Sequence, residues 1–359
     1  MDWKNDITRK LDIPYPVIQA PMFGVGTPEM AAATARMGGL GSLPLGDLPA
    51  DRCIELVRET GKLTDRPFAV NIFVNEIPPV TDALRRQYDE TRRFVERLAS
   101  DHGLDIGLPG IESFQLTDYR EQVDALIAEN CGIVSFTFGN PDAGSIQRFK
   151  RHGTTLIGTC TSVEEALVLE GAGVDIICVQ GLEAGGHRGS FAAGPVPGVG
   201  GFSLLPQVCD AVKTPVVYAG GIYNGRTLLA SQVLGAQGFQ VGSLLLCSRE
   251  SALLDFEKKA LADAGHGQVV LTDSFSGRYA RGLGNAFTEA LDGSGHVLPY
   301  PYQNKLTGEL RKLAKKAGNI DFVSVWTGNS LPEFSTASTT EILMRLVKDA
   351  EAAASGRRF

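Results

Sequence analysis

Short apolar segments recur along the chain in a pattern that predicts parallel β-strands. Each of eight such runs is five to nine residues long, partly β-branched or aromatic, and apolar at consecutive positions instead of alternate ones. The runs cover residues 17–22, 39–44, 68–74, 133–138, 155–159, 174–180, 215–219 and 238–246. Strands that are apolar on both faces are typical of a parallel sheet that helices cover on both sides.

Segments with helical character fill the gaps between these runs. The expected helices cover residues 27–37, 50–60, 118–129, 162–171, 203–212 and 225–234. Ser162 and Glu165 have the spacing of a capping box, and Asn224 is a suitable N-cap for the helix that would stop at Gly235. Eight strands that alternate with helices indicate either a (β/α)8 barrel or a doubly wound sheet.

The positions of the glycines favour the barrel. A dinucleotide-binding sheet requires G-x-G-x-x-G at its first strand-to-helix turn, whereas this turn has Gly24 and Gly26 without the third glycine. The glycine-rich turns instead follow the sixth, seventh and eighth strands, and barrels commonly bind phosphate after strands 7 and 8. We therefore predict an α/β fold of the (β/α)8 TIM barrel type.

Two regions exceed what a minimal barrel needs. Residues 75–131 include a charged helical stretch over 82–100, and residues 250–330 contain two short helical runs and a proline–tyrosine segment. We interpret 250–330 as a small lid or cap near the C-terminus, beside the mouth of the barrel. Residues 1–249 and 331–359 then form the barrel, to which the amphipathic run 338–353 is expected to return.

Composition and charge narrow the class of partner. The chain of 359 residues has 42 glycines, a net charge of −7 and a pI of about 5.4. It lacks the basic character that nucleic acid requires, and no segment reaches the ~18 apolar residues that cross a bilayer. The first residues, MDWKND, do not resemble a secretory signal. We expect a cytoplasmic protein that acts on small molecules, with no nucleic-acid or membrane partner.

Neither cysteine nor histidine occurs at the spacing of a metal site. The six cysteines include no C-x-x-C pair, and the five histidines are scattered. We interpret the cysteines as reduced core residues and expect no metal.

The ends of the last two strands can form a phosphate site. Gly220 and Gly221 follow one strand, and Gly242 and Ser243 interrupt the next apolar run. Glycine lets backbone N–H groups approach a phosphate, and Ser243 adds a hydroxyl donor. The plainer interpretation is a pair of structural turns.

The end of the sixth strand carries the best candidate for a reactive group. Gln180 offers an amide for a heterocycle edge, Gly185 and Gly186 allow a flat ligand to pack closely, and His187 can act as a general base or hydrogen-bond donor near pH 7. A lone histidine is more often structural, but this one lies in a glycine-rich loop at the predicted mouth. Asn71 is a polar residue within an apolar strand, where it either pairs with backbone groups or faces a ligand in the barrel. Met22 at the end of the first strand is either a core residue or a wall against an aromatic ring.

These segments together resemble the nitronate monooxygenase family, formerly called 2-nitropropane dioxygenases. The resemblance extends from about residue 13 to 330 and rests on IQAPM (18–22), NIFV (71–74), VQGLEAGGH (179–187), AGGI (219–222) and QVGS (240–243). The lid segments FSGR (275–278) and PYPYQN (299–304) also look like the family.

The resemblance implies a TIM barrel that holds FMN non-covalently and uses His187 as its active-site histidine. The cofactor-binding residues would be Ala20, Pro21, Met22, Asn71, Gln180, Gly185, Gly186, Gly220, Gly221, Gln240, Val241, Gly242 and Ser243. The substrate-side candidates are Tyr300, Tyr302 and Lys305. In such enzymes an alkyl nitronate reduces FMN, and O2 completes the conversion to a carbonyl compound and nitrite. His187 would bind the nitronate or remove the α-proton of a nitroalkane.

Three alternative functions remain open at this stage. The protein could also form a homodimer. Related barrels resemble this chain and are FMN-dependent enoyl-acyl carrier protein reductases or quinone reductases, which consume NAD(P)H. A non-redox barrel that binds a phosphorylated ligand belongs to another class. A nucleotide dehydrogenase would need a nucleophilic cysteine, for which Cys160 and Cys178 near strand ends are the candidates.

Overall fold

The chain folds into a closed barrel of eight parallel strands, as the sequence predicts. The computed structural model describes residues 2–192, 195–331 and 333–356. The strands are hydrogen-bonded in the order β1-β9-β8-β6-β5-β4-β3-β2. Backbone bonds from Gln19 to Leu40 (3.0 Å) and from Leu40 to Val17 (2.9 Å) join the first strand to the second and close the ring. The barrel strands are β1 (Val17–Gln19), β2 (Gly41–Gly46), β3 (Phe68–Phe73), β4 (Ile133–Thr137), β5 (Thr155–Cys160), β6 (Ile176–Gln180), β8 (Val216–Ala219) and β9 (Gly238–Val241).

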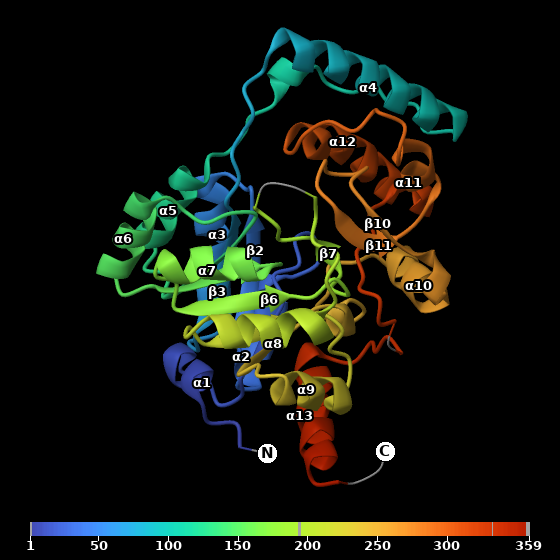
Figure 1. Cartoon of the computed structure of the whole chain (residues 1–359). Helices are drawn as coiled ribbons and strands as arrows, with labels where there is room; N and C mark the ends of the chain where they lie inside the picture. Colours follow the sequence, from blue (N-terminus) through green and yellow to red (C-terminus); the bar gives the residue numbers. More distant parts are fainter. Residues whose placement is uncertain (1, 193–194, 332, 357–359) are drawn as a thin grey trace.

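Helices surround this barrel and complete a (β/α)8 architecture (Figure 1). They are α2 (Pro28–Arg36), α3 (Ala50–Leu63), α5 (Tyr119–Ala128), α6 (Ala143–Arg151), α7 (Val163–Gly171), α8 (Gly201–Ala211), α9 (Gly225–Val233) and α13 (Thr339–Ala354). The last helix, α13, packs against α9 and α2, so the C-terminal segment returns to the barrel as the sequence predicts. None of the helices in the described residues is long and apolar enough to cross a membrane.

Local capping explains where two of these helices begin. The Asn224 side chain accepts hydrogen bonds from the backbone of Arg226 and Thr227, which confirms it as the N-cap of α9. Ser162 caps α7 by accepting from the N–H of Glu165, but the other half of the predicted capping box is wrong. The Glu165 carboxylate is buried and bonds elsewhere, because a group of unpaired N–H donors in the next loop lies within its reach.

The interior of the barrel changes from apolar to polar along the strands. Its lower part is an apolar cluster of inward-facing residues, which includes Ile18, Leu40, Ile157 and Cys178. Helix α1 (Asp6–Leu11) closes this end with Ile7 and Leu11. Side chains two positions further along a strand point the same way. The next interior positions are polar on six strands: Ser42, Asn71, Ser135, Thr159, Gln180 and Gln240.

A cap stands between the last barrel strand and the last barrel helix. It contains α10 (Asp255–Asp263), β10 (Val269–Thr272), β11 (Ala280–Leu283), α11 (Ala286–Leu291) and α12 (Tyr302–Ala317), with short 3-10 turns at Ser243–Leu245, His266–Gln268 and Ile320–Phe322. The expectation of two short helical runs was therefore too simple. The predicted eighth strand, 238–246, was also too long. The strand ends at Val241, and the apolar residues that follow lie in and after a 3-10 turn. Apolarity alone does not separate these conformations.

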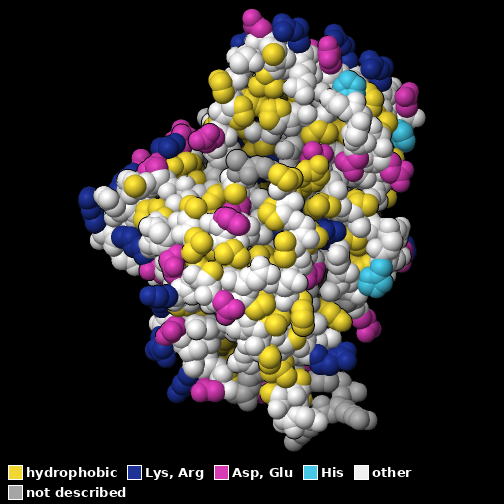
Figure 2. Space-filling view, in the orientation of Figure 1, with side chains coloured by type: hydrophobic (Ala, Val, Ile, Leu, Met, Phe, Trp, Pro, Cys, Tyr) yellow, Lys and Arg dark blue, Asp and Glu magenta, His cyan; other side chains and the backbone are white. Residues whose placement is uncertain are grey.

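The cap shares an apolar core with helix α4 (Asp82–Asp101), which comes from the insertion between β3 and α5. Leu84, Tyr88 and Val95 of α4 belong to one buried cluster with Leu306 and Leu310 of α12. In Figure 1 α4 lies across the top of the cap. Basic and acidic side chains are interspersed on the face in Figure 2, which shows no extended basic patch.

Candidate functional site

Two glycine turns face each other where the neighbouring strands β8 and β9 end. Gly220 and Gly221 have φ values of +128° and +65°, a conformation that glycine adopts without strain. Outside the strand pairings of the described residues, the backbone N–H groups of Gly220, Gly221, Gly242 and Ser243 have no hydrogen-bond partner. N–H donors of glycine turns on adjoining strand ends form a cradle that fits a phosphate group.

The loop after β1 packs against this cradle. The N–H of Ala20 donates to the carbonyl of Val241 (2.8 Å), and Val241 itself is buried. A Cβ at Gly242 would lie 3.3 Å from the Cβ of Ala20 and 3.6 Å from Sδ of Met22. Pro21 links these two residues in the chain. The predicted cofactor-side residues 20–22 and 241–243 therefore lie together.

A segment returning from the cap covers the other side of the glycine turns. The N–H of Gly328 donates to Oγ of Ser243 (2.9 Å), and the N–H of Asn329 donates to the carbonyl of Glu183 (3.0 Å). A Cβ at Gly185 would stand 2.5 Å from the backbone of the same segment, so only glycine fits there. Next to it, Gly186 has φ +71°. The two glycines thus allow the loop to pass beneath the cap.

The predicted polar residues of the barrel interior have different partners. Asn71 donates to Oγ of Ser135 (2.9 Å) on the next strand and, more weakly, to Oγ1 of Thr137 (3.4 Å). Gln180 donates to the carbonyl of His187 (2.9 Å) and accepts from the N–H of Gly189 (2.9 Å). Asn71 therefore pairs within the barrel, while Gln180 holds the histidine loop.

The Gln240 amide has no hydrogen-bond partner among the residues that the structure describes. It lies at the mouth, partly exposed, on the strand that ends in the second glycine turn. A free amide beside a set of free N–H groups is a suitable contact for the polar edge of a ring.

His187 is fixed by a small sheet that connects the barrel to the cap. It lies in β7 (Gly186–His187), where it pairs with Ala280 of β11. Its Nε2 atom is 2.8 Å from Oγ of Ser276. The main-chain pairing and this side-chain contact together orient the imidazole.

Aromatic rings surround His187 on several sides. The ring centroids of Phe138, Trp326 and Phe73 are 5.3, 5.7 and 6.3 Å from that of the imidazole. Phe138 has φ +75°, which is rare for a bulky residue and marks a strained position of the kind that clusters at functional sites. These walls make a low-dielectric environment around the histidine.

This environment keeps His187 neutral. Burial lowers its pKa to about 3, and the positive charges of Arg311 and Arg278 act in the same direction. Arg278 places its guanidinium 4.4 Å from the Phe138 ring centroid and 5.8 Å from that of Tyr300. A neutral imidazole near a guanidinium can accept a proton while the cation stabilises a neighbouring anion.

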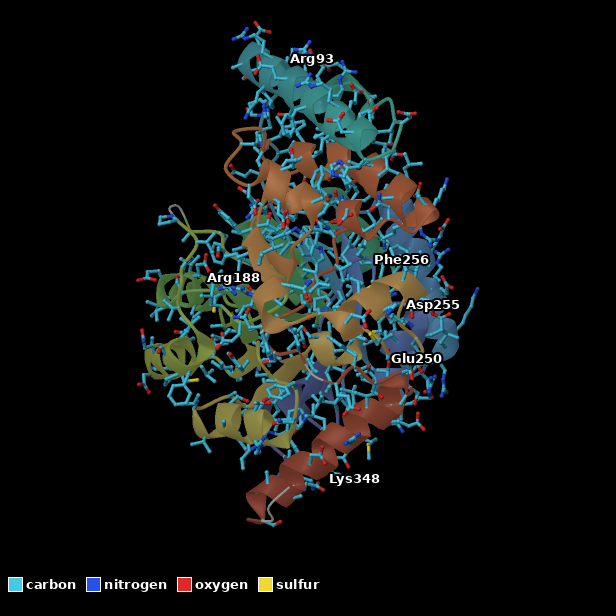
Figure 3. All side chains as sticks on the ribbon, turned by 90° about the vertical axis from the view of Figure 1, so that its right-hand side faces the viewer. Arg93, Arg188, Glu250, Asp255, Phe256 and Lys348 are labelled. Carbon is cyan, nitrogen blue, oxygen red and sulfur yellow. The ribbon has the colours of Figure 1, made fainter. Side chains whose placement is uncertain are left out.

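Two buried charged residues hold the histidine loop from behind. Arg188 donates to the carbonyls of Gly181 (2.6 Å) and Gln180 (3.1 Å), which cap the end of β6. Figure 3 labels it where the barrel meets the cap. Glu165 accepts from the N–H groups of Phe191 (2.5 Å) and Ala192 (2.8 Å) and from Thr161 on β5's loop (2.6 Å). Sequence reasoning assigned Arg188 no role and gave Glu165 only a place in a capping box.

The three substrate-side candidates are separated by the fold. Tyr300 lies 5.6 Å from Phe138 between ring centroids, and its hydroxyl is buried without a partner among described residues. Lys305 pairs with Asp47 at 3.0 Å. The Tyr302 hydroxyl donates to the backbone carbonyl of Pro78 (2.6 Å), in the segment that leads to α4.

Sequence reasoning missed Ser276, Arg278 and the aromatic walls. The segment FSGR (275–278) was noted only as family-like. Its residues reach the site because the β11–β7 pairing brings them beside His187. No spacing in the sequence gives that juxtaposition.

The structure disfavours a nucleophilic cysteine. Burial raises the pKa of Cys178 to about 12, and it raises the pKa of Cys160 well above its usual value. Such thiols stay protonated and unreactive near neutral pH. The described residues also contain no group of three or more His, Cys, Asp or Glu that could hold a metal ion.

The fold and the site define a TIM-barrel enzyme with a histidine at the C-terminal mouth of the barrel. The sequence profile of the family described as nitronate monooxygenase matches residues 4–349. A probable nitronate monooxygenase of Staphylococcus haemolyticus is 37% identical over 353 residues, 97% of each chain. Another, from Staphylococcus saprophyticus, is 38% identical over 358 residues, 98% of each.

Two solved structures extend the comparison. A nitroalkane oxidase from Streptomyces ansochromogenes superimposes with a TM-score of 0.89 at 33% identity, over 98% of this chain and 99% of that one. FabK from Thermotoga maritima superimposes with a TM-score of 0.75 at 26% identity, over 98% of both chains. This chain belongs to the nitronate monooxygenase family and is a flavin-dependent oxidoreductase.

Proposed function

We propose that the protein binds FMN and oxidises alkyl nitronates and nitroalkanes with O2 to a carbonyl compound and nitrite. The observation that carries this proposal is the pairing of a glycine-turn N–H cradle with a neutral histidine at one barrel mouth. A flavin that carries a phosphate suits such a cradle, and a nitro compound needs both a base and an anion-stabilising group.

The cradle of Gly220, Gly221, Gly242 and Ser243 would hold the phosphate, and the free Gln240 amide would contact the ring edge. When bound, the flavin supplies the redox chemistry, accepting electrons from the substrate and passing them to O2. The protein's part is to orient and to enclose. The returning segment at Gly328 covers the cradle, which keeps water from the phosphate side.

The histidine and its neighbours would act on the substrate. His187 removes the α-proton from a nitroalkane, since it is neutral near pH 7. The nitronate that forms carries its negative charge on the nitro oxygens, and the Arg278 guanidinium above Phe138 stabilises that charge. The aromatic walls exclude water, which strengthens both interactions. A nitronate supplied directly needs only the binding step.

Anaerobic spectroscopy tests the proposal. The purified protein is mixed separately with ethyl nitronate, propionate 3-nitronate, NADH and NADPH, and the visible flavin band is recorded. Loss of that band with a nitronate, followed by nitrite release after admission of air, is the expected result. Loss with a nicotinamide alone, and none with either nitronate, would instead support the reductase alternative.

A variant pair links the activity to the histidine. His187→Asn should keep the flavin bound but lower kcat/KM with nitroethane by about 10²-fold, the scale of lost acid–base catalysis. The matched control is His296→Asn, since His296 stacks on Phe94 outside the rings of the site. Unchanged turnover of His187→Asn would remove the histidine from the reaction.

A further inference from the structure

The hydroxyl of Ser276 has more neighbours than it has protons. Its Oγ lies 2.8 Å from Nε2 of His187, 3.0 Å from the carbonyl of Arg278 and 3.3 Å from the N–H of Arg278. A serine hydroxyl donates one hydrogen bond and accepts up to two. The three contacts are therefore compatible with only a few proton arrangements.

The backbone contacts select one of these arrangements. The Arg278 carbonyl can only accept, and Ser276 is its only hydrogen-bond partner among the described residues outside the strand pairings. The serine proton therefore goes to that carbonyl, and Oγ is left as an acceptor. The Arg278 N–H donates to it from one side, so His187 must also donate. Nε2 of His187 then carries the imidazole proton.

The surroundings make this preference strong. Ser276 is buried, with 2% of its surface exposed, and the rings of Phe138 and Trp326 stand near the imidazole. At so buried a hydroxyl, two acceptors or two donors that face each other are costly. Nδ1 of His187 has no hydrogen-bond partner in the described chain. The lone pair of the neutral ring is therefore on the nitrogen that the protein leaves free.

We propose that Ser276 is a positioning residue that fixes His187 as the Nε2–H tautomer and thereby makes Nδ1 the proton acceptor. This inference deepens the proposed function and rests on it for the reaction step. The Cα–H bond of a nitroalkane breaks, and its electron pair becomes the C=N bond of the nitronate. The proton forms a new N–H bond on Nδ1, and His187 becomes an imidazolium. The substrate class is thus a neutral nitroalkane with at least one α-hydrogen, besides preformed nitronates.

Nitrogen NMR on protein labelled with 15N-histidine reads the tautomer directly. The His187 signals are assigned by their absence in His187→Asn. Wild type should show a single neutral Nε2–H form, and Ser276→Thr, which keeps the hydroxyl, should show the same form. Ser276→Ala should show the averaged signals of both tautomers. An Nδ1–H form in wild type would overturn the proposal, as would an unchanged spectrum of Ser276→Ala.

Kinetics with a matched pair of substrates separate positioning from general damage. Ethyl nitronate needs no base, whereas nitroethane does. Ser276→Ala should lower kcat/KM for nitroethane by about 10-fold or more, a fraction of the ~10²–10⁴ that acid–base catalysis contributes. The value for ethyl nitronate should change less than about 2-fold. Equal losses with both substrates would contradict the role.

A neighbouring serine provides the control. Ser274 is also buried, but its hydroxyl contacts Thr272 and not the histidine. Ser274→Ala should leave the His187 signals unchanged, and also the ratio of kcat/KM for nitroethane to kcat/KM for ethyl nitronate. A change in either would show that any substitution in this segment disturbs the histidine, and would contradict a specific role of the Ser276 contact. If wild type oxidises neither substrate, the proposed function fails. The NMR result still decides the tautomer, including when Ser276→Ala does not fold, because the wild-type spectrum suffices.

Discussion

The neutral state of His187 predicts how the stability of the folded protein depends on pH. In the folded chain, burial and two nearby arginines hold the pKa at about 3. In the unfolded chain the pKa of histidine is about 6.5. Between these values the unfolded chain binds a proton that the folded chain does not. The free energy of unfolding therefore falls as the pH drops below about 6.5, and it stops falling below about 3.

The size of the effect follows from the shift. A pH of 5 is about 1.5 units below the pKa of histidine in the unfolded chain, and one pKa unit corresponds to about 1.36 kcal/mol. The His187 contribution should therefore lower the free energy of unfolding by about 2 kcal/mol between pH 7 and pH 5. Carboxylates also titrate in this window, but they are the same in a variant that lacks only the imidazole.

Urea unfolding of wild type and His187→Gln at pH 7 and pH 5 measures this contribution. The loss of stability between the two pH values should be about 2 kcal/mol smaller in His187→Gln, whatever its absolute stability. His266→Gln is the control, because His266 is exposed in the cap, and it should behave as wild type. The same pH-dependent loss in wild type and His187→Gln would show that the pKa of His187 is the same in the folded and the unfolded chain, and would refute the low pKa.

Three further substitutions test the site. Glu165→Gln should lower the free energy of unfolding by about 2–3 kcal/mol, because an amide cannot accept from both sets of N–H donors that the carboxylate holds. Glu164→Gln, at the exposed neighbouring residue, should leave the free energy of unfolding unchanged. Equal losses of stability in the two variants, measured by urea unfolding, would refute the role of the Glu165 carboxylate. Gly185→Ala should destabilise by about 1–3 kcal/mol, since its Cβ would stand 2.5 Å from the returning backbone. Gly107→Ala, where a Cβ meets nothing, is its control and should melt higher than Gly185→Ala. Gly221→Val should weaken FMN binding about 10-fold or more, which corresponds to about 1.4 kcal/mol, and titration of the apoprotein with FMN measures this. An affinity equal to that of wild type would show that the phosphate does not bind at Gly221.

The barrel was predictable because its signal is local and repeated. Each strand is a short apolar run that must be covered on both sides, and some helices have a recognisable capping residue, such as Asn224 at the start of α9. The glycine turns at Gly220 and Gly242 were visible for a similar reason, because a free backbone at a strand end needs glycine. Boundaries were less certain where an apolar run continues from Val241 into a 3-10 turn.

The cap was harder to predict than the barrel. Its core combines α4 and α12, which are far apart in the sequence, and an apolar face on each helix does not show which partner covers it. The two helical runs expected in 250–330 are three helices and a strand pair.

The sequence by itself determined the fold class, the glycine turns at the strand ends and the position of His187 on the sixth strand's loop. These features depend on residue type at short spacing. Only the tertiary structure decided which groups His187 meets. Ser276 and Phe138 reach it from a cap segment and from another strand. The tautomer and the low pKa of an imidazole depend on the atoms within a few ångströms of it, and chain folding, not chain order, brings those atoms together.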